Sequence, residues 1–86
     1  MAERKVGFVS HYFGHIMVAA IEITEGELKV GETIHFKGHT TDFTQKVDSI
    51  QIEHANVTVA KKGDSIGMKV IEHARQHDEV YVVIEE

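Results

Sequence analysis

The amino-acid sequence predicts an all-β protein, and three observations support that prediction. Six short segments alternate between apolar and polar residues, with the period of two that is typical of β-strands. Turns marked by glycine and polar residues separate them, and no segment shows ten residues of helical periodicity. A chain of 86 residues is long enough for one hydrophobic core. A closed barrel is expected, because closure removes the exposed edges of a sheet.

The six strands together predict a single domain over residues 1–86, ordered roughly from 4 to 85. The apolar positions of the fourth segment change from odd to even after Val47, so a bulge is expected near Asp48–Ser49. The predicted strands are Lys5–Ser10, Ile16–Ile23, Thr33–Lys37, Phe43–Glu53, Ser65–Val70 and Glu79–Ile84.

The second strand is the most apolar of the six. Glu22 must face water, so a period of two places Ile16, Val18 and Ala20 on the same outward side. Either another part of the chain or a partner should cover this apolar side, and a second copy of the chain is one such partner. In the first strand, the same period places Val6 and Phe8 on one face.

Glycine residues predict turns in two regions of the chain. Gly26 and Gly31 bracket a short stretch, because glycine tolerates positive φ where a chain turns sharply. Leu28 and Val30 lie two apart within it and are expected to enter the core together as plugs. The other region is residues 62–64, where a turn is predicted around Gly63.

Composition and charge exclude several classes of protein. The formal charge of −5 argues against nonspecific binding to nucleic acid, although a local basic face remains possible. The absence of cysteine excludes a disulfide framework and thiolate metal sites. The longest apolar run, residues 16–21, is too short to span a membrane, and the N-terminus lacks the apolar core of a signal peptide. A cytoplasmic protein without membrane association is therefore expected.

Histidine is frequent, and three pairs show a spacing of four residues. Such a pair can bind one metal ion on a helix, whereas residues four apart on a strand lie roughly 13 Å apart. Only the third pair could sit on a helical turn, and no carboxylate cluster completes a ligand set. No metal site is therefore predicted, and exposed histidines are the favoured interpretation. The pairs are His11 with His15, His35 with His39, and His73 with His77.

Two motifs together resemble the second domain of translational GTPases, the elongation-factor β-barrel. The first motif, "G-x-L/V-x-x-G-D", is matched by Gly26, Leu28, Gly31 and Glu32, with Glu in place of the usual Asp. The second, "A-G-D-x-V-G-L", is matched by Gly63, Asp64, Ile66, Gly67 and Met68. Their order and spacing make the pair more specific than either motif alone, and the similarity covers roughly residues 5–84.

The resemblance implies a six-stranded closed Greek-key β-barrel of the translation-factor type, present as a stand-alone domain. The chain contains no G-x-x-x-x-G-K-[ST] phosphate loop, which binding of a nucleoside triphosphate would require. The chain is therefore predicted not to be an enzyme, and to hold no nucleotide and no cofactor by itself.

Relatives in that family hold the end of a tRNA or dock on ribosomal RNA. By position, the resemblance implies a polar pocket lined by Gln51, Glu53 and Ser65. The hairpin around residues 38–42 carries Lys37, His39 and Lys46 together with several threonines, a set of groups that can contact phosphates. The alternative for this hairpin is an ordinary solvated turn, since Asp42 lowers its charge.

Three functional hypotheses follow. The first is a non-catalytic module that binds tRNA, rRNA or a translation-related protein supplying the missing domains. The second is an accessory protein-interaction subunit that completes an RNA-modifying or peptidase-like enzyme in trans. The third is a small metal-responsive or pH-responsive protein, which depends on the histidines alone.

Overall fold

The computed structural model describes residues 2–84, and this part of the chain contains ten β-strands and no helix. The all-β prediction is confirmed, and within these residues no helix exists that could cross a membrane. The strands in chain order are β1 Ala2–Phe13, β2 Val18–Ile23, β3 Glu27–Lys29, β4 Thr33–Lys37, β5 Asp42–Lys46, β6 Ile50–Ile52, β7 Ala55–Val57, β8 Val59–Lys61, β9 Ser65–Lys69 and β10 Glu79–Ile84.

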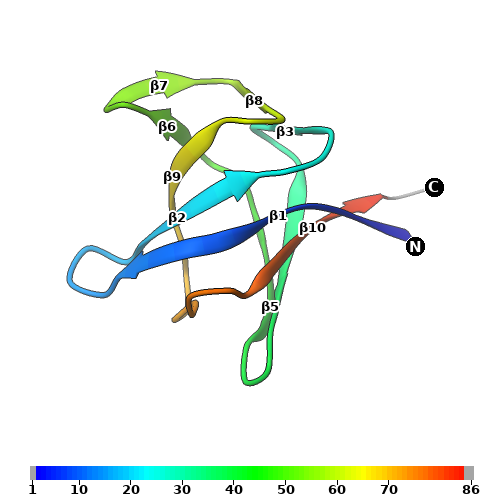
Figure 1. The fold of residues 1–86 in the computed structure, drawn as a ribbon, viewed down its shortest axis with the longest axis vertical. Helices are drawn as coiled ribbons and strands as arrows, with labels where there is room; N and C mark the ends of the chain where they lie inside the picture. Colours follow the sequence, from blue (N-terminus) through cyan, green and yellow to red (C-terminus); the bar gives the residue numbers. More distant parts are fainter. Residues whose placement is uncertain (1, 85–86) are drawn as a thin grey trace.

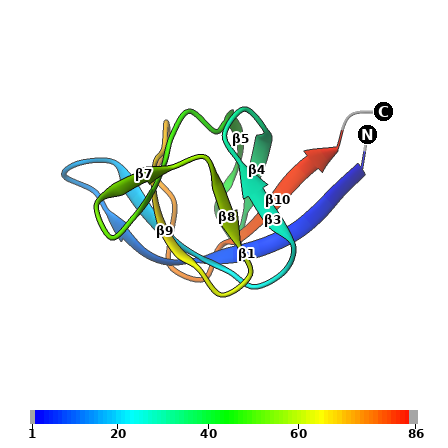
Figure 2. The ribbon, with the colours of Figure 1, turned by 90° about the horizontal axis from the view of Figure 1, so that it is seen from above.

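Eight of these strands form one antiparallel sheet in the order β5-β4-β10-β1-β2-β9-β6-β7. The long β1 lies between β10 and β2 and is the centre of the arrangement (Figure 1). Ala2 pairs with Ile84, so the two described ends lie together on one side, while the β1–β2 hairpin points to the other. Seen from above, the sheet curls around the interior of the molecule (Figure 2).

The curled sheet does not close into the expected barrel. Its end strands, β5 and β7, do not pair with each other in residues 2–84. After β5 the chain turns a corner at residues 47–49, where the Val47 N–H donates to the carbonyl of Glu32 at 2.8 Å and Val47 itself is buried. The phase change of the predicted fourth strand is therefore real, but it divides that strand into β5 and β6 instead of forming a bulge within one strand.

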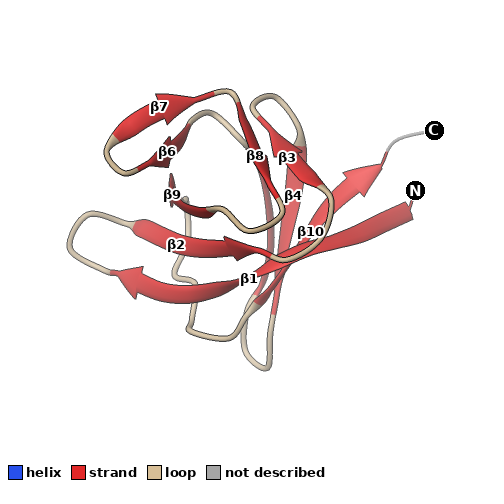
Figure 3. Cartoon of the chain, turned by 45° about the horizontal axis from the view of Figure 1, so that its top comes forward, coloured by secondary structure: helices blue, strands red, loops and turns tan. Residues whose placement is uncertain are grey.

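The hydrophobic core fills the inner side of the curl. On β2, every second residue is buried, which is the alternation that the sequence predicts. β3 and β8 pair as a separate two-stranded sheet beside the beginning of β4 (Figure 3). The largest fully buried side chains are Phe36, Ile21, Ile23, Leu28, Ile34, Ile50, Met68, Val6, Val9, Val47 and Val80.

The glycine turns are confirmed, but only one of the two expected plugs is. Gly26, Gly31 and Gly63 have φ of +61°, +98° and +97°, values that favour glycine over any side chain. Leu28 is fully buried in β3, whereas Val30 is 39% exposed. The reason is that Val30 already belongs to the turn after β3, where the alternation of an extended strand no longer applies.

The predicted face of the first strand is also wrong. Val6 and Val9 are both fully buried, and Phe8 is only half-buried on the outward side. The pairing of β1 with β10 shifts register between Lys5 and Gly7, which changes the face that later residues present. Regular alternation cannot survive such an irregularity, so Val6 and Phe8 do not share a face.

Candidate functional site

The outward side of β2 is the starting point of the candidate site. Val18, Ala20 and Glu22 are half-buried there, between residues that point into the core. Ile16 lies just before β2, in the turn of the β1–β2 hairpin, and is 60% exposed. Phe13, at the end of β1, is 46% exposed in the same hairpin. The predicted apolar side is therefore present, and it leads to an exposed apolar hairpin tip.

A groove of about 500 Å³ opens over this apolar side. Its floor comes from β2 and β9, whose residues Ala20 and Gly67 are paired. The structure brings the predicted apolar residues and the predicted polar pocket residues into this one groove. The lining residues are Phe13, Ile16, Val18, Ala20, Gln51, Glu53, His54, Ser65, Ile66 and Gly67.

The polar wall of the groove contains hydrogen-bonding groups from β6, β9 and the β6–β7 turn. The Gln51 Nε2 donates to Asn56 Oδ1 at 3.2 Å, which holds the amide across the β6–β7 hairpin. The Ser65 Oγ donates to Glu22 Oε1 at 2.6 Å, which links β9 to β2. Glu53 is exposed, and within residues 2–84 it has no ion-pair partner.

The β6–β7 turn that carries Glu53 and His54 has an unusual backbone. Ile52 pairs with Ala55, so Glu53 and His54 form the whole turn, and their φ angles are 50° and 67°. Two positive φ values are required by the type I′ turn that suits a two-residue hairpin, and glycine or asparagine normally supplies them. Each strained residue costs on the order of 1 kcal/mol or more. The fold thus holds two ionisable side chains at the groove in a conformation that their residue types do not favour.

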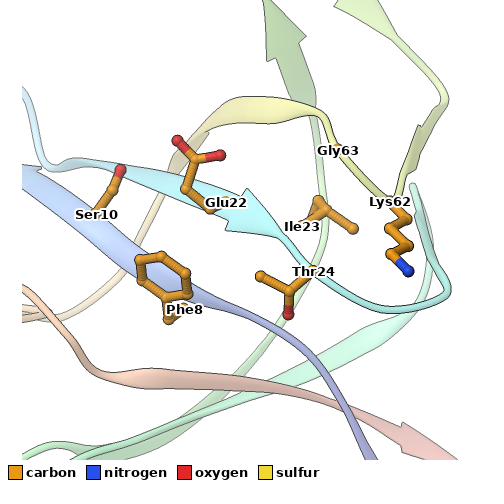
Figure 4. A pocket seen from close by; sticks show the side chains of 7 residues that line it. All are labelled: Phe8, Ser10, Glu22, Ile23, Thr24, Lys62 and Gly63. Atoms are coloured by element: carbon orange, nitrogen blue, oxygen red, sulfur yellow. The ribbon is translucent and has the colours of Figure 1, made fainter.

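A second hollow, of about 580 Å³, lies on the same outward face beyond Glu22 (Figure 4). The ring of Phe8 lies with Ser10 and Glu22 at one end of the hollow, and the Lys62 side chain lies at the other end, beyond Ile23 and Thr24. Ser65 lines the groove and bonds Glu22, which lines the hollow, so the two depressions adjoin. The remaining lining residue is Gly63.

The basic residues predicted to contact phosphates do not line the groove. Lys37, His39 and Lys46 are all exposed on or beside the β4–β5 hairpin. Lys37 pairs with Asp42 and with Glu79, while Lys46 pairs with Thr33 at the other end of the ladder. Four residues of strand separate the two lysines, which corresponds to roughly 13 Å. The structure therefore spreads these charges and places carboxylates beside one of them.

The three histidine pairs do not form metal sites in the part of the chain that the structure describes, where no group of three suitable ligands occurs. The segment of His73 and His77 contains no helix, so the one expected possibility of a helical turn is wrong. The His11 and His73 rings lie against the rings of Phe13 and Tyr12, with centroids 4.5 and 4.4 Å apart.

His35 has a different environment from the other histidines. Its Nε2 contacts Asp42 on β5 and its Nδ1 contacts Glu3 on β1 at 2.7 Å. The hydrogen bond to Asp42 raises the pKa of the imidazole, Glu3 adds to this, and partial burial opposes it. A neutral imidazole has only one N–H, so the protonated ring satisfies both carboxylates best. Sequence spacing alone does not reveal this contact, because Glu3 lies 32 residues away.

Sequence reasoning also missed four groove residues, Phe13, His54, Ile66 and Gly67. By residue type Phe13 is expected to be a core or turn plug, and neither Gly67 nor His54 has a local signal of a binding role. Gly67 matters because a Cβ added there would meet only the Val18 Cγ1 at 3.7 Å, so the space above it is open. Only the pairing of β9 with β2 and β6 places this glycine in the groove floor.

Comparison with known proteins identifies relatives over most of the chain. No family model matches it. It is 38% identical over 82 residues to an uncharacterized protease of Methanocaldococcus jannaschii, covering 94% of this chain and 20% of that protein. It is 40% identical over 77 residues to a collagenase of Porphyromonas gingivalis, covering 88% of this chain and 21% of the collagenase. The chain thus spans about a fifth of the length of these relatives.

Solved structures show the same fold. The C-terminal domain of a Geobacillus thermoleovorans protein described as a U32 peptidase superimposes with a TM-score of 0.87 at 18% identity, covering 94% of this chain and 93% of that domain. Its selenomethionine variant gives a TM-score of 0.83 at 19% identity, over 90% and 96% of the two chains. At these identities the likeness establishes the fold.

These findings correct the resemblance to translational GTPases. The relatives are named as a protease and as collagenases, and the structural neighbours are U32 peptidase C-terminal domains. The expected translation role is therefore wrong. The prediction that the chain is not an enzyme is contradicted by the same relatives, whose names indicate an enzyme-related function. The glycine turns of the two motifs are not specific to translational GTPases, because any compact sheet with short loops needs residues of positive φ at its corners.

Proposed function

We propose that this chain is an accessory domain of a U32-peptidase-like enzyme and that it binds polypeptide. The names of its relatives support the first part, since they include a protease and a collagenase. The likeness to U32 peptidase C-terminal domains supports the same assignment. The domain serves the enzyme either as part of the same polypeptide or as a separate chain.

The observation that carries the binding role is the groove between the β1–β2 hairpin and the β6–β7 turn. It combines an apolar floor at Val18 and Ala20 with a polar wall at Gln51, Glu53 and Ser65. An extended polypeptide offers both kinds of group, because apolar side chains alternate along it with backbone amides that need hydrogen-bond partners. The exposed apolar residues Phe13 and Ile16 extend this surface.

RNA binding is less well supported by the same structure. Lys37 and Lys46 stand at opposite ends of their hairpin, and carboxylates accompany Lys37. Phosphate recognition gains most from several closely placed cations, and the net charge of the chain is −5. Lys37, His39 and Lys46 therefore do not lie together in one site. Their contact with RNA stays a prediction.

The first prediction fills the groove at Gly67. Its Cβ position is free of clashes and its φ is not positive, so Gly67→Thr should fold, and a β-branched residue suits a strand. We expect soluble gelatin to broaden or shift the amide signals of Ala20, Gln51 and Gly67 in the wild-type chain. In a gelatin titration followed by the groove signals, the variant should bind at least about tenfold more weakly, which corresponds to about 1.4 kcal/mol of binding free energy.

Gly14→Ala is the matched control, because Gly14 lies in the β1–β2 turn outside the groove lining and a Cβ there meets only the Tyr12 ring at 3.6 Å. It should bind gelatin like the wild type. Signal changes confined to the β4–β5 hairpin, or equal binding by Gly67→Thr, would contradict the proposed site.

A further inference from the structure

A further pocket, of about 370 Å³, lies beside the last part of β1. β1 pairs with β10 only as far as Phe8, whereas its pairing with β2 continues to Phe13. Beyond Phe8, the loop between β9 and β10 runs beside β1, because the Val9 N–H donates to the Asp78 carbonyl at 2.8 Å and the His77 N–H donates to the Val9 carbonyl at 2.7 Å. We call the space between this loop and β1 the β1-end pocket.

The loop between β9 and β10 is held in place along its length. At its start, the Val70 N–H donates to the Met17 carbonyl at 2.9 Å. In its middle, Ala74 is fully buried, and the Arg75 N–H donates to the Asp78 Oδ2 at 2.7 Å. The β1-end pocket is therefore formed before any ligand arrives, which lowers the entropic cost of binding.

The polar side chains that line the β1-end pocket are hydrogen-bond donors. Arg75 supplies a guanidinium, Tyr12 a phenol and Gln76 an amide, while His11 and His73 supply imidazoles. No lining residue carries a carboxylate, although acidic residues outnumber basic ones by 14 to 9 in the whole chain. The chemistry of the lining therefore favours an anion.

Arg75 is the lining residue whose charge is permanent. It is exposed, and within residues 2–84 no ion pair includes it. The nearby carboxylate of Asp78 is buried and accepts from the backbone of Arg75. One guanidinium matches the single charge of a carboxylate, which it can bind in a bidentate manner, better than the nearly double charge of a phosphate monoester.

The β1-end pocket adjoins the groove across β1. His11 lines the pocket and pairs with Ala20 in the groove floor, and its ring lies against the ring of Phe13, which lines the groove. From β2 across β1 to the loop is two strand spacings, or roughly 10 Å. About three residues of an extended polypeptide cover this distance.

We propose that the β1-end pocket binds a carboxylate of the polypeptide whose apolar side chain occupies the groove. The Arg75 guanidinium donates to the carboxylate, and the neutral donors of the pocket surround it. The carboxylate is either the C-terminus of the polypeptide or an acidic side chain about three residues from the apolar one. This inference rests on the proposed polypeptide-binding function and adds a second point of contact to it.

Three N-acetylated peptides test the inference on the whole 86-residue chain labelled with nitrogen-15. Each begins with leucine and two glycines. The first ends in aspartate with an amidated C-terminus, the second in asparagine with a free C-terminus, and the third in asparagine with an amidated C-terminus, so that only the third has no carboxylate. All three should shift the amides of Ala20 and Gly67.

We expect the first or the second peptide to bind about tenfold more tightly than the third and to shift the Arg75 Nε signal, as a charge-assisted hydrogen bond predicts. The peptide that binds more tightly identifies the source of the carboxylate as a side chain or a C-terminus. Equal gains for both would mean that the pocket accepts either source.

Arg75→Gln removes the charge and leaves the backbone N–H that donates to Asp78. In this variant the three peptides should bind with equal affinity, while the amide spectrum stays that of the folded chain. Arg4→Gln is the matched control, because it removes the other arginine of the chain, which is exposed and lines neither the groove nor the β1-end pocket. It should keep the full preference for a carboxylate.

The possible results separate this inference from the function on which it rests. If all three peptides shift the groove amides with equal affinity, or if the preference survives in Arg75→Gln, polypeptide binding stands and the carboxylate site is overturned. If no peptide shifts these amides, both are overturned. If inorganic phosphate shifts the Arg75 Nε signal at lower concentration than acetate does, the pocket selects phosphate and the carboxylate site is overturned.

Discussion

At the residue scale, His35 shows how much a side chain depends on its neighbours. The imidazole joins three strands, because Glu3 belongs to β1, His35 to β4 and Asp42 to β5. These contacts lie near the end of the sheet where the described chain begins and ends. His11 and His73 lie against aromatic rings, and His54 lies in the β6–β7 turn. Histidine content alone therefore cannot predict which residue responds to pH.

Because the pKa of His35 is raised above that of an unfolded chain, its protonated form stabilises the fold. This contribution is complete below the unfolded pKa of about 6.5 and is lost as pH rises through the higher folded value. The free energy of unfolding should therefore differ most between wild type and His35→Gln at pH 5.5 and least at pH 9, as measured by urea denaturation. His39→Gln, at an exposed position in the same hairpin, is the control. A difference that is independent of pH would contradict the assignment.

At the scale of elements, turns and strands differ in how well local sequence predicts them. The bounds of β10 agree with the predicted strand Glu79–Ile84, because acidic residues at 78 and at 85–86 flank a short run rich in valine. The turns at Gly26, Gly31 and Gly63 also agree, since positive φ selects glycine locally. The β6–β7 turn was missed, because Glu53 and His54 are not turn residues by type and only the surrounding hairpin imposes their positive φ.

The short β3 gives a prediction at this scale. Leu28→Ala should lower the free energy of unfolding by about 2–5 kcal/mol, because a fully buried leucine leaves a cavity when it is truncated. Val30→Ala, two residues away but 39% exposed, should change it by less than about 1 kcal/mol. Urea denaturation of both variants measures the contrast. Equal losses would show that Val30 is a plug after all.

At the scale of the whole molecule, charge and shape act together. The described ends lie on one side and the β1–β2 hairpin, whose residues Phe13 and Ile16 line the groove, lies on the other (Figure 1). The chain carries a charge of −5 with neutral histidines, and protonation of all seven histidines would bring it to +2. Mild acid thus removes the net negative charge that keeps copies of the chain apart.

Solubility should consequently be lowest near the isoelectric point of about 5.7. Turbidity of concentrated solutions between pH 4.5 and 8 measures this, and added salt should reduce the dependence on pH by screening. A flat turbidity profile would mean that the apolar tip, and not net charge, controls association. Replacing Ile16, which is 60% exposed, with Ser would distinguish these two causes, because the change leaves the net charge as it is.

The local sequence was sufficient to predict the fold class, the glycine turns, the outward side of β2 and the phase change after Val47, because each depends on residues that are neighbours in the chain. Tertiary structure alone decided three other features. It opened the sheet between β5 and β7, it exposed Val30, and it assembled one groove from the β1–β2 hairpin, the β6–β7 turn and β9. The physical reason is that strand pairing joins residues distant in sequence, such as Ala20 with Gly67, and its register depends on the whole sheet.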